Sequence, residues 1–337
     1  MARNLQISGV FMKKKSFVAV ACLAAVLAGS LTGCFIRQDN FLKSYGEAAF
    51  SYTPYSLVTL SEAERAEAFA ENFVVVSDSL NNLDSDITSV SASLYCLDDN
   101  TAIYAKNVHQ SMNPASLTKL MTAYLAVKYG NLDDIVTITD ASVITEKGAS
   151  KIGLNTGDKI SLRDLLYCSL IYSGNDAAAA IAVHICGSQE AFAGLMTKEA
   201  ALLGATNTTF KNPHGLTEEG HLTTAYDIYL IMKEVIKNDI ILDCINQTAY
   251  TYTYMGADGK EITKTVNSTN KYFAKQYAVP AGITVIGGKT GTTIAAGNCL
   301  ALLTQDTSTG KFYISIILKA SNVDNLYGEM SKLLELR

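Results

Sequence analysis

The residues of this sequence that are best suited to chemistry are a serine and a lysine three positions apart, Ser116 and Lys119. An unassisted serine hydroxyl is a weak nucleophile near neutral pH and needs an adjacent base. Lysine can be that base only if its pKa falls from about 10.4 towards 7–8, which burial or a second nearby cation can cause. The pair therefore predicts attack on a carbonyl carbon, although the same spacing also occurs by chance in surface helices.

The segment 113–129 has the signals of a helix that would position this pair. Asn113 is a favoured N-cap residue, Pro114 suits the first helical position, and Gly130 can close the helix as its C′ residue. Residues three apart lie on one helix face, with Cβ atoms about 5–6 Å from each other. Ser116 also falls in the first turn, where backbone N–H groups have no partner within the helix and are available to a substrate.

Two further motifs follow this one along the chain. Ser173-Gly174-Asn175 falls between two expected helices, and Lys289-Thr290-Gly291-Thr292 falls on an expected strand just after two glycines. Taken singly, the first is also consistent with a helix–helix turn and the second with an edge-strand lysine. Together they match the order Ser-x-x-Lys, Ser-Asp-Asn and Lys-Thr-Gly, which is typical of penicillin-binding proteins and class A β-lactamases.

With these motifs in order, the sequence resembles the serine D-Ala-D-Ala carboxypeptidases, the low-molecular-mass penicillin-binding proteins of peptidase family S11. The resemblance runs from about Ser89 to the C-terminus, and Gly174 within the second motif is the form usual in this family. It implies removal of the terminal D-alanine from peptidoglycan stem peptides, covalent inhibition by β-lactam antibiotics, and no cofactor or metal. Further matching stretches are Leu165-Leu166, Asn212-Pro213-His214-Gly215-Leu216 and Thr223-Thr224-Ala225-Tyr226-Asp227.

The resemblance also implies which residues carry out the reaction. Ser116 would form the acyl-enzyme, Lys119 would take its proton, and Ser173 would relay that proton towards the leaving D-alanine. The backbone N–H groups of Ser116 and Thr292 would form the oxyanion hole, in which one donor is typically worth about 10²–10³ in rate.

A second group of residues is expected to bind the substrate. Asn175 would orient the peptide, while Lys289 would lower the pKa of Lys119 and, together with Thr290, hold the substrate carboxylate. His184 and His214 also fall in matching stretches, and we interpret both as structural.

Three other functions share parts of this pattern. A D,D-endopeptidase would use the same groups on cross-linked peptides, and a non-catalytic penicillin sensor would keep the motifs without turnover. A β-lactamase needs a deacylating glutamate, but the only Glu-x-x-x-Asn string in the relevant region, Glu234 to Asn238, falls within an amphipathic helix and too far past the second motif. We therefore favour a carboxypeptidase.

The first 33 residues have the pattern of a lipoprotein signal peptide. Three lysines at 13–15 precede an apolar run that ends in Leu31-Thr32-Gly33-Cys34, which resembles a lipobox. Lipidation of Cys34 would hold the protein at the extracytoplasmic face of a bacterial membrane, although an ordinary signal peptide or membrane anchor would share the apolar run. Residues 34–87 read as a spacer with one helix, from Ser61 to Phe73, and the catalytic domain is expected to span 88–337 with no C-terminal β domain.

Composition excludes several classes of function. Without residues 1–33, which hold four basic and no acidic side chains, the net charge falls from −5 to −9, so nothing indicates a nucleic-acid partner. The seven cysteines and four histidines lack metal-ligand spacing and a disulfide framework. Cys96, Cys168, Cys186, Cys244 and Cys299 are interpreted as small buried hydrophobic residues.

Hydrophobic periodicity predicts an α+β fold, an α/β sandwich, and the resemblance implies that it is of the β-lactamase/transpeptidase-like type. An antiparallel sheet would be built from both ends of the chain, around a mostly helical middle, with a terminal helix packed on the sheet. The expected strands are 90–96, 102–105, 135–139, 285–293, 299–305 and 312–319, and the expected helices are 161–171, 176–185, 188–203, 224–237 and about 326–334.

Overall fold

The computed structural model describes residues 74, 76–80 and 86–337, which belong to one compact unit. The expected signal peptide, Cys34 and the expected helix Ser61–Phe73 lie outside the described residues. The helices and strands, in chain order, are β1 (Ser79–Leu80), β2 (Ser91–Cys96), β3 (Thr101–Lys106), the 3₁₀ helix η2 (Ala115–Leu117), α2 (Thr118–Tyr129), β4 (Ile135–Thr137), the 3₁₀ helix η3 (Asp140–Ser142), β5 (Lys159–Ser161), α3 (Leu162–Ile171), α4 (Asn175–Cys186), α5 (Gln189–Leu202), α6 (Ala225–Val235), α7 (Asp239–Asn246), β6 (Ala249–Met255), β7 (Glu261–Asn267), β8 (Ile283–Thr293), β9 (Gly297–Asp306), β10 (Phe312–Ala320) and α8 (Val323–Leu334).

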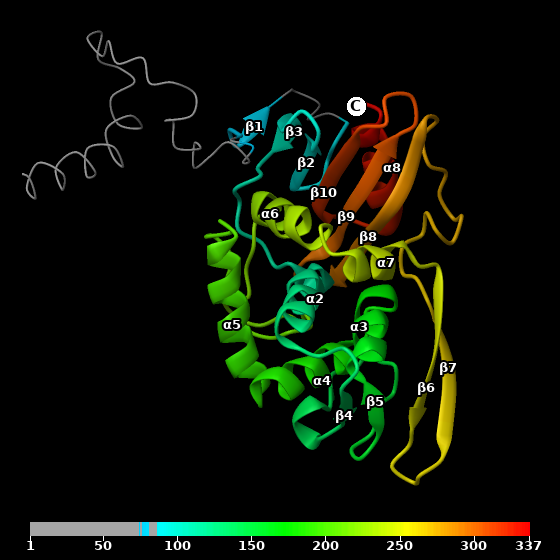
Figure 1. Cartoon of the computed structure of the whole chain (residues 1–337). Coiled ribbons are helices and arrows are strands. Elements are labelled where there is room, and N and C mark those ends of the chain that lie inside the picture. The colour runs from blue at the N-terminus through cyan, green and yellow to red at the C-terminus, as the bar shows by residue number, and fades with distance from the viewer. Residues whose placement is uncertain (1–73, 75, 81–85) are drawn as a thin grey trace, which may run out of the picture. The chain divides into compact units, whose positions relative to one another are not determined.

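The central sheet contains strands from both ends of the described chain. Its order is β1-β3-β2-β10-β9-β8, and every neighbouring pair is antiparallel. β2 lies beside β10, with Tyr313 opposite Cys96 and Leu318 opposite Ser91 (Figure 1). The predicted α+β class and the shared sheet are therefore confirmed. β1 adds an edge strand from within the stretch expected to be a spacer.

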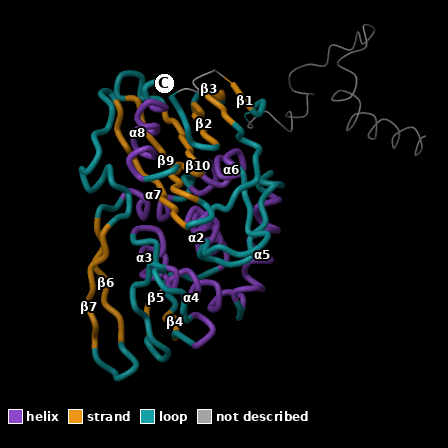
Figure 2. Tube along the Cα trace, turned by 180° about the vertical axis from the view of Figure 1, so that it is seen from behind, coloured by secondary structure: helices purple, strands orange, loops and turns teal. Residues whose placement is uncertain are grey.

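Helices cover both faces of this sheet, as Figures 1 and 2 show from opposite sides. On one face, Leu94 and Ile317 pack in a core with Met330 of α8. On the other face, Tyr95 stacks on Tyr229 of α6, with ring centroids 4.0 Å apart, and joins the core of the helical part. Because successive strand side chains point to opposite faces, burial on both sides makes the central strands largely apolar, with a few buried serines and threonines such as Ser93 and Ser315.

The helical part also carries a second sheet, of order β4-β5-β6-β7. Its β6–β7 hairpin was not expected from the sequence. The alternation of Tyr250, Tyr252 and Tyr254 with threonines is the strand signal that marks it. The helices α3, α5 and α6 begin where expected, because Ser161, Ser188 and Thr224 accept hydrogen bonds from backbone N–H groups of their first turns.

The helix of the first motif reaches Tyr129 as predicted, but its expected capping is wrong. A 3₁₀ turn precedes α2, and the Asn113 side chain donates to the His221 carbonyl, 3.0 Å away, instead of capping the helix. Gly130 is extended, with φ −96°, rather than left-handed. A Cβ there would lie 2.5 Å from Leu162 Cδ2, so close packing against α3 requires glycine.

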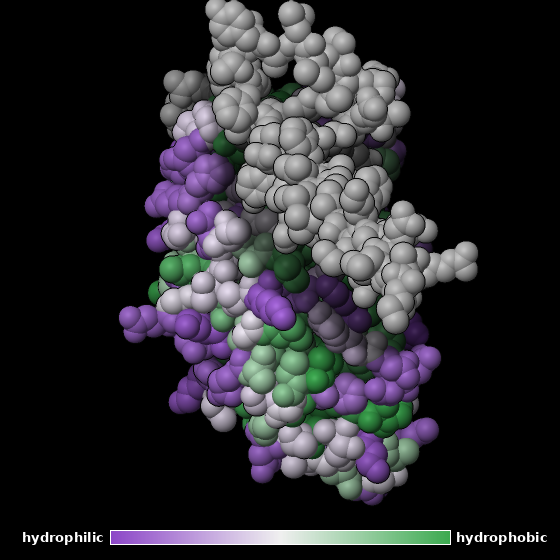
Figure 3. Space-filling view, turned by 60° about the vertical axis from the view of Figure 1, so that its left-hand side comes forward, coloured by the Kyte–Doolittle hydropathy of each residue, from purple (hydrophilic) through white to green (hydrophobic). Residues whose placement is uncertain are grey.

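The surface formed by the described residues is mixed in polarity. On the face in Figure 3, hydrophilic side chains surround a smaller hydrophobic area. None of the described helices is long and apolar enough to cross a membrane, and the described residues contain no group of side chains that could hold a metal ion. Of the five cysteines described, all but the half-buried Cys186 are buried, which agrees with their interpretation as packing residues.

Candidate active site

The three motifs meet at one cavity of about 200 Å³, where η2 lies against the end of β8. Ser116, Ser173 and Thr290 line it, together with Gly291 and Thr292. A Cβ on Gly291 would lie 3.0 Å from the Ser116 nitrogen and 3.2 Å from the Pro114 carbonyl oxygen. Glycine at this position therefore lets β8 pass directly beside the turn that carries Ser116.

The Lys119 amine is buried at the bottom of this arrangement. Its Nζ lies 3.0 Å from Ser116 Oγ, 2.7 Å from Asn175 Oδ1 and 2.6 Å from the His214 carbonyl oxygen. Burial, followed by the positive charge of Lys289, holds the pKa of Lys119 well below its usual range, and Asp176 opposes the shift. The structure thus supplies the two causes that a basic lysine requires.

The contacts of Lys119 indicate where its lone pair points. A neutral amine has two hydrogens and one lone pair, and two of the three partners are carbonyl oxygens, which only accept hydrogen bonds. Those two oxygens take the two hydrogens. In the neutral form of Lys119, the lone pair is then left to face Ser116 Oγ, which is the geometry that a general base requires.

Ser173 and Lys289 form a second serine–lysine pair beside the first. Lys289 Nζ donates to Ser173 Oγ at 3.0 Å and to the Thr290 carbonyl at 2.9 Å. Its burial lowers the pKa of this lysine to about 7. The amine is buried beside the cavity, and the two groups that it contacts, Ser173 and Thr290, line the cavity.

The backbone is strained at two positions of this site. Ala115 has φ +48° and Ser173 has φ +67°, values that side-chain-bearing residues rarely adopt and that cost about 1–3 kcal/mol each. Packing holds the first of them in place. A Cβ on Gly215 would lie 1.9 Å from the Ala115 oxygen, so this loop presses directly on the residue before Ser116.

His221 helps to hold the turn at Ala115 in place through Thr118. His221 Nδ1 accepts from the Lys211 N–H at 3.0 Å, so its Nε2 carries the proton and donates to Thr118 Oγ1 at 2.9 Å. Thr118 in turn donates to the Ala115 carbonyl at 2.8 Å. Burial first, and then the charge of Lys119, lowers the pKa of His221 to about 4, which keeps it neutral.

The rings of the two histidines singled out from the sequence hydrogen-bond to groups other than the reacting side chains, although the His214 backbone carbonyl contacts Lys119. His214 is buried, with its pKa lowered to about 3 chiefly by burial, and its Nδ1 accepts from the Leu216 N–H at 3.2 Å. His184 lies on α4 and faces Asp134 Oδ2 at 3.1 Å.

One cavity residue was missed by the sequence reasoning. Lys271 is the only lysine among the described residues that line the cavity. Its backbone N–H donates to the Tyr327 hydroxyl of α8 at 2.9 Å, which ties this loop to the sheet. Lys271 lies outside the three motifs, and only the pairing of distant segments brings it here.

An antiparallel α/β sandwich with a buried Ser–Lys pair between its two parts defines the β-lactamase/transpeptidase-like class. Within that class, the chain belongs to peptidase family S11, because the family described as D-alanyl-D-alanine carboxypeptidase matches residues 78–322.

Comparison with individual proteins agrees with this family. The chain is 34% identical over 254 residues to the D-alanyl-D-alanine carboxypeptidase DacF of Bacillus subtilis, covering 73% of this chain and 61% of the relative. It is 36% identical over 238 residues to DacC of Escherichia coli, covering 68% and 56%. The chain thus spans less than two thirds of the length of these relatives. The crystal structure of the Streptomyces K15 DD-transpeptidase superposes with a TM-score of 0.67 at 28% identity, covering 74% of this chain and 97% of that one.

Proposed function

We propose that this protein is a serine D,D-carboxypeptidase that removes the terminal D-alanine from peptidoglycan stem pentapeptides. The observation that carries the proposal is the contact of 3.0 Å between the buried Lys119 amine and Ser116 Oγ, at the edge of a cavity that all three motifs line. The relatives named as D-alanyl-D-alanine carboxypeptidases support the choice of substrate.

The reaction follows from the contacts of these groups. Lys119 takes the hydroxyl proton as Ser116 Oγ attacks the carbonyl carbon of the penultimate D-alanine. The C–N bond breaks, and the proton passes through Ser173 to the amine of the leaving D-alanine, which gives an ester on Ser116. Water then hydrolyses the ester, with Lys119 again as the base.

Backbone donors stabilise the negative charge that develops on the carbonyl oxygen. The N–H groups of Ser116 and Thr292 form this oxyanion hole, and the close approach of Gly291 to Ser116 supports their convergence. Asn175, whose side-chain oxygen accepts from Lys119, orients the peptide beside the nucleophile. β-Lactam antibiotics acylate Ser116 by the same attack and are covalent inhibitors.

The carboxylate of the terminal D-alanine is held at the opposite side of the cavity. Thr290 lines the cavity and its hydroxyl lies 2.6 Å from that of Thr269, while the buried charge of Lys289 lies behind it. Lys271 adds an ammonium group that is half-buried rather than enclosed. Charge-assisted hydrogen bonds from these groups favour a substrate that ends in a free carboxylate.

Amidation of the substrate's C-terminus should therefore lower kcat/KM by roughly 10–100-fold, since a hydrogen bond to a charged group is worth about 1.5–3 kcal/mol. Lys271→Gln should cause a similar loss on the free acid and a smaller one on the amide. Lys275→Gln changes an exposed lysine four residues away and is the control. The rate of D-alanine release measures the effect of amidation and the effect of Lys271→Gln. Equal kcat/KM on acid and amide would contradict a carboxypeptidase and favour an endopeptidase, whose substrate continues past the cut.

The proposed location is the extracytoplasmic face of a bacterial membrane, with lipid on Cys34. The support is the order of the N-terminal signals, which are three lysines, an apolar run, and Gly33 directly before Cys34. Lipid at this cysteine would tether the catalytic unit near the peptidoglycan on which it acts.

Cys34→Ala should move the protein from the membrane fraction to the soluble extract, because one acyl-modified residue provides the attachment. Cys22→Ala, which changes the other cysteine of the N-terminal segment, should leave the protein in the membrane fraction. Fractionation followed by immunoblotting measures the distribution. A Cys34→Ala protein that stays with the membrane after a high-salt wash would refute lipid attachment at this residue.

A further inference from the structure

A second cavity, of about 260 Å³, opens between the β6–β7 hairpin and the loop before α4. Two lysines, Lys151 and Lys264, and two tyrosines, Tyr172 and Tyr252, line it. None of them belongs to the three motifs. The cavity is large enough for one side chain and too small for a whole peptide.

The second cavity shares its rim with the catalytic one. Ser150 lines the catalytic cavity and Lys151 the second, and Ser173 lines the catalytic cavity while Tyr172 lines the second. The Asn175 N–H donates to the Ser150 carbonyl at 2.8 Å, which fixes the two segments together. The two cavities are therefore lined by consecutive residues of the same two segments, 150–151 and 172–173.

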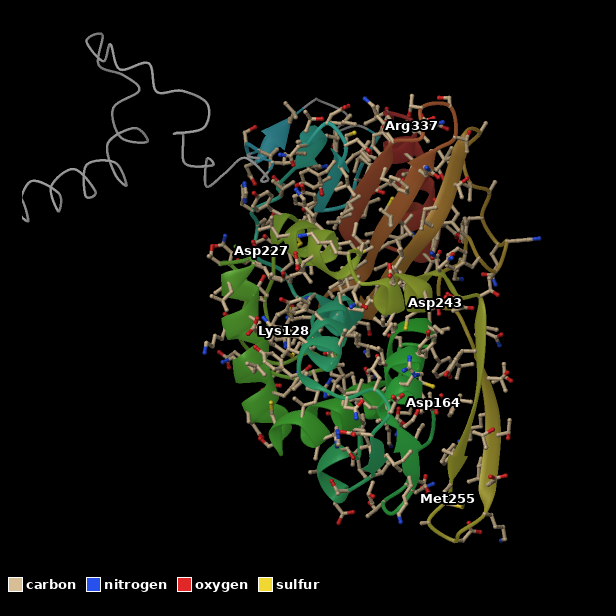
Figure 4. All side chains as sticks on the ribbon, viewed as in Figure 1. Lys128, Asp164, Asp227, Asp243, Met255 and Arg337 are labelled. Atoms are coloured by element: carbon tan, nitrogen blue, oxygen red, sulfur yellow. The ribbon has the colours of Figure 1, made fainter. Side chains whose placement is uncertain are left out.

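The hairpin wall of this cavity is held firmly to α3. The Tyr250 hydroxyl donates to Asp164 at 2.6 Å, and its ring stacks on Tyr167 with centroids 4.4 Å apart. Tyr167 donates to Asp243 of α7 at 2.6 Å. Asp164 and Asp243 lie between the helices and the hairpin in Figure 4. The cavity is thus preformed rather than dependent on a loose loop.

The residues that line the cavity include two lysines and no carboxylate. Neither Lys151 nor Lys264 forms a salt bridge with a carboxylate of the described residues. Lys264 donates to the Ile152 carbonyl at 2.8 Å, and Lys151 donates to the Ile144 carbonyl at 2.9 Å. The nearby Asp176 accepts from the backbone N–H groups of 152–154, which occupies its oxygens.

Each ammonium group has three donors, so both keep hydrogen-bonding capacity for an anion. Lys264 is half-buried and its Nζ lies 5.4 Å from the centre of the Tyr254 ring, which holds the side chain in one place. A partly buried charge is screened less by salt than an exposed one. One half-buried and one exposed ammonium group beside two tyrosines suit a carboxylate on a short peptide.

We infer that this cavity binds a free carboxylate of the substrate peptide upstream of the scissile bond. The inference rests on the proposed carboxypeptidase function, in which the peptide ends at the leaving D-alanine. Nothing continues beyond that residue, so any part of the peptide that reaches a neighbouring cavity belongs to the acyl half. The enzyme then discriminates stem peptides that carry a free upstream carboxylate from those in which it is amidated.

The test compares two pentapeptides that end in D-Ala-D-Ala and differ only in one upstream acidic residue, present as the free acid or as the primary amide. The wild-type protein should hydrolyse the acid with a kcat/KM about tenfold higher. Lys264→Met and Lys151→Met should each lower kcat/KM on the free-acid peptide towards its value on the amide. Lys264→Arg, which keeps the cation, should retain the preference for the acid. Lys260→Met, at the tip of the same hairpin beside Asp258, is the control.

Each outcome decides one question. Equal rates on acid and amide in the wild type would overturn the inference, as would a preference that survives both lysine-to-methionine changes. An equal loss of kcat/KM on the acid and the amide peptides in the methionine variants would give these lysines a structural role and would also overturn the inference. Failure to hydrolyse either pentapeptide would instead contradict the proposed carboxypeptidase function.

Discussion

Ser116→Ala should abolish covalent labelling by fluorescent penicillin and lower D-alanine release by at least about 10⁴-fold, because no other group replaces the attacking oxygen. Ser116 is half-buried and the change removes one hydroxyl, so the free energy of unfolding should stay within about 0.5 kcal/mol. Gel electrophoresis of the labelled protein measures the covalent labelling, and a thermal melt measures the stability.

Ser173→Ala is the informative comparison for this change. Its hydroxyl contacts Lys289 and not Lys119, so the variant should still be labelled by penicillin while it turns over peptide more slowly. Loss of labelling in both variants would point to a general collapse of the cavity. Stoichiometric labelling of the Ser116→Ala protein would show that another residue is the nucleophile.

Gly215→Ala should also lower activity strongly, although Gly215 is not among the residues that line the cavity. Its φ of +90° is unfavourable for alanine, and the new Cβ would lie 1.9 Å from the Ala115 oxygen and 2.9 Å from Thr118 Oγ1. The overlap between the new Cβ and the Ala115 oxygen can be relieved only if the turn before Ser116 moves. Displacement of a reacting group by about 1 Å can cost roughly 10²-fold in rate, and overpacking with left-handed strain costs about 2–5 kcal/mol.

Gly148→Ala is the matched control for this change. Gly148 has a similar φ, +78°, but a Cβ at this position would meet no other atom within 4 Å, so only the backbone strain of about 1–2 kcal/mol applies. Urea unfolding and D-alanine release should therefore separate the two variants. Equal losses in both would mean that backbone strain, and not the contact with Ala115, sets the effect.

The sequence was sufficient for the three motifs because each is a short string with its own local structure. Ser116 and Lys119 are one helical turn apart, and the glycines before Lys289 mark a strand that another backbone approaches closely. Their convergence could be expected only from the resemblance to a family. No local pattern places Ser173 beside Lys289, since 116 positions separate them.

The errors have a common physical origin in contacts between distant segments. Asn113 has the propensity of an N-cap, but a loop 108 positions later offers its side chain a carbonyl instead. Lys271 and Lys264 fall in stretches without a chemical motif, and folding alone brings them to the two cavities. The hairpin that carries Lys264 was not predicted, although its tyrosines alternate with threonines as in a strand.

The pairing of β2 with β10 has a consequence for how the chain folds. Thr88 and Ser89, just before β2, also donate hydrogen bonds to Glu329 of α8, which lies 241 positions after Thr88. Contacts of such long range form slowly, because the entropy of closing the loop is lost before they stabilise anything. During synthesis β10 must leave the ribosome before β2 gains its second neighbour in the sheet, and α8 must follow before the face with Leu94 is covered. Until then that apolar face of β2 stays exposed, which keeps the nascent chain within reach of chaperones.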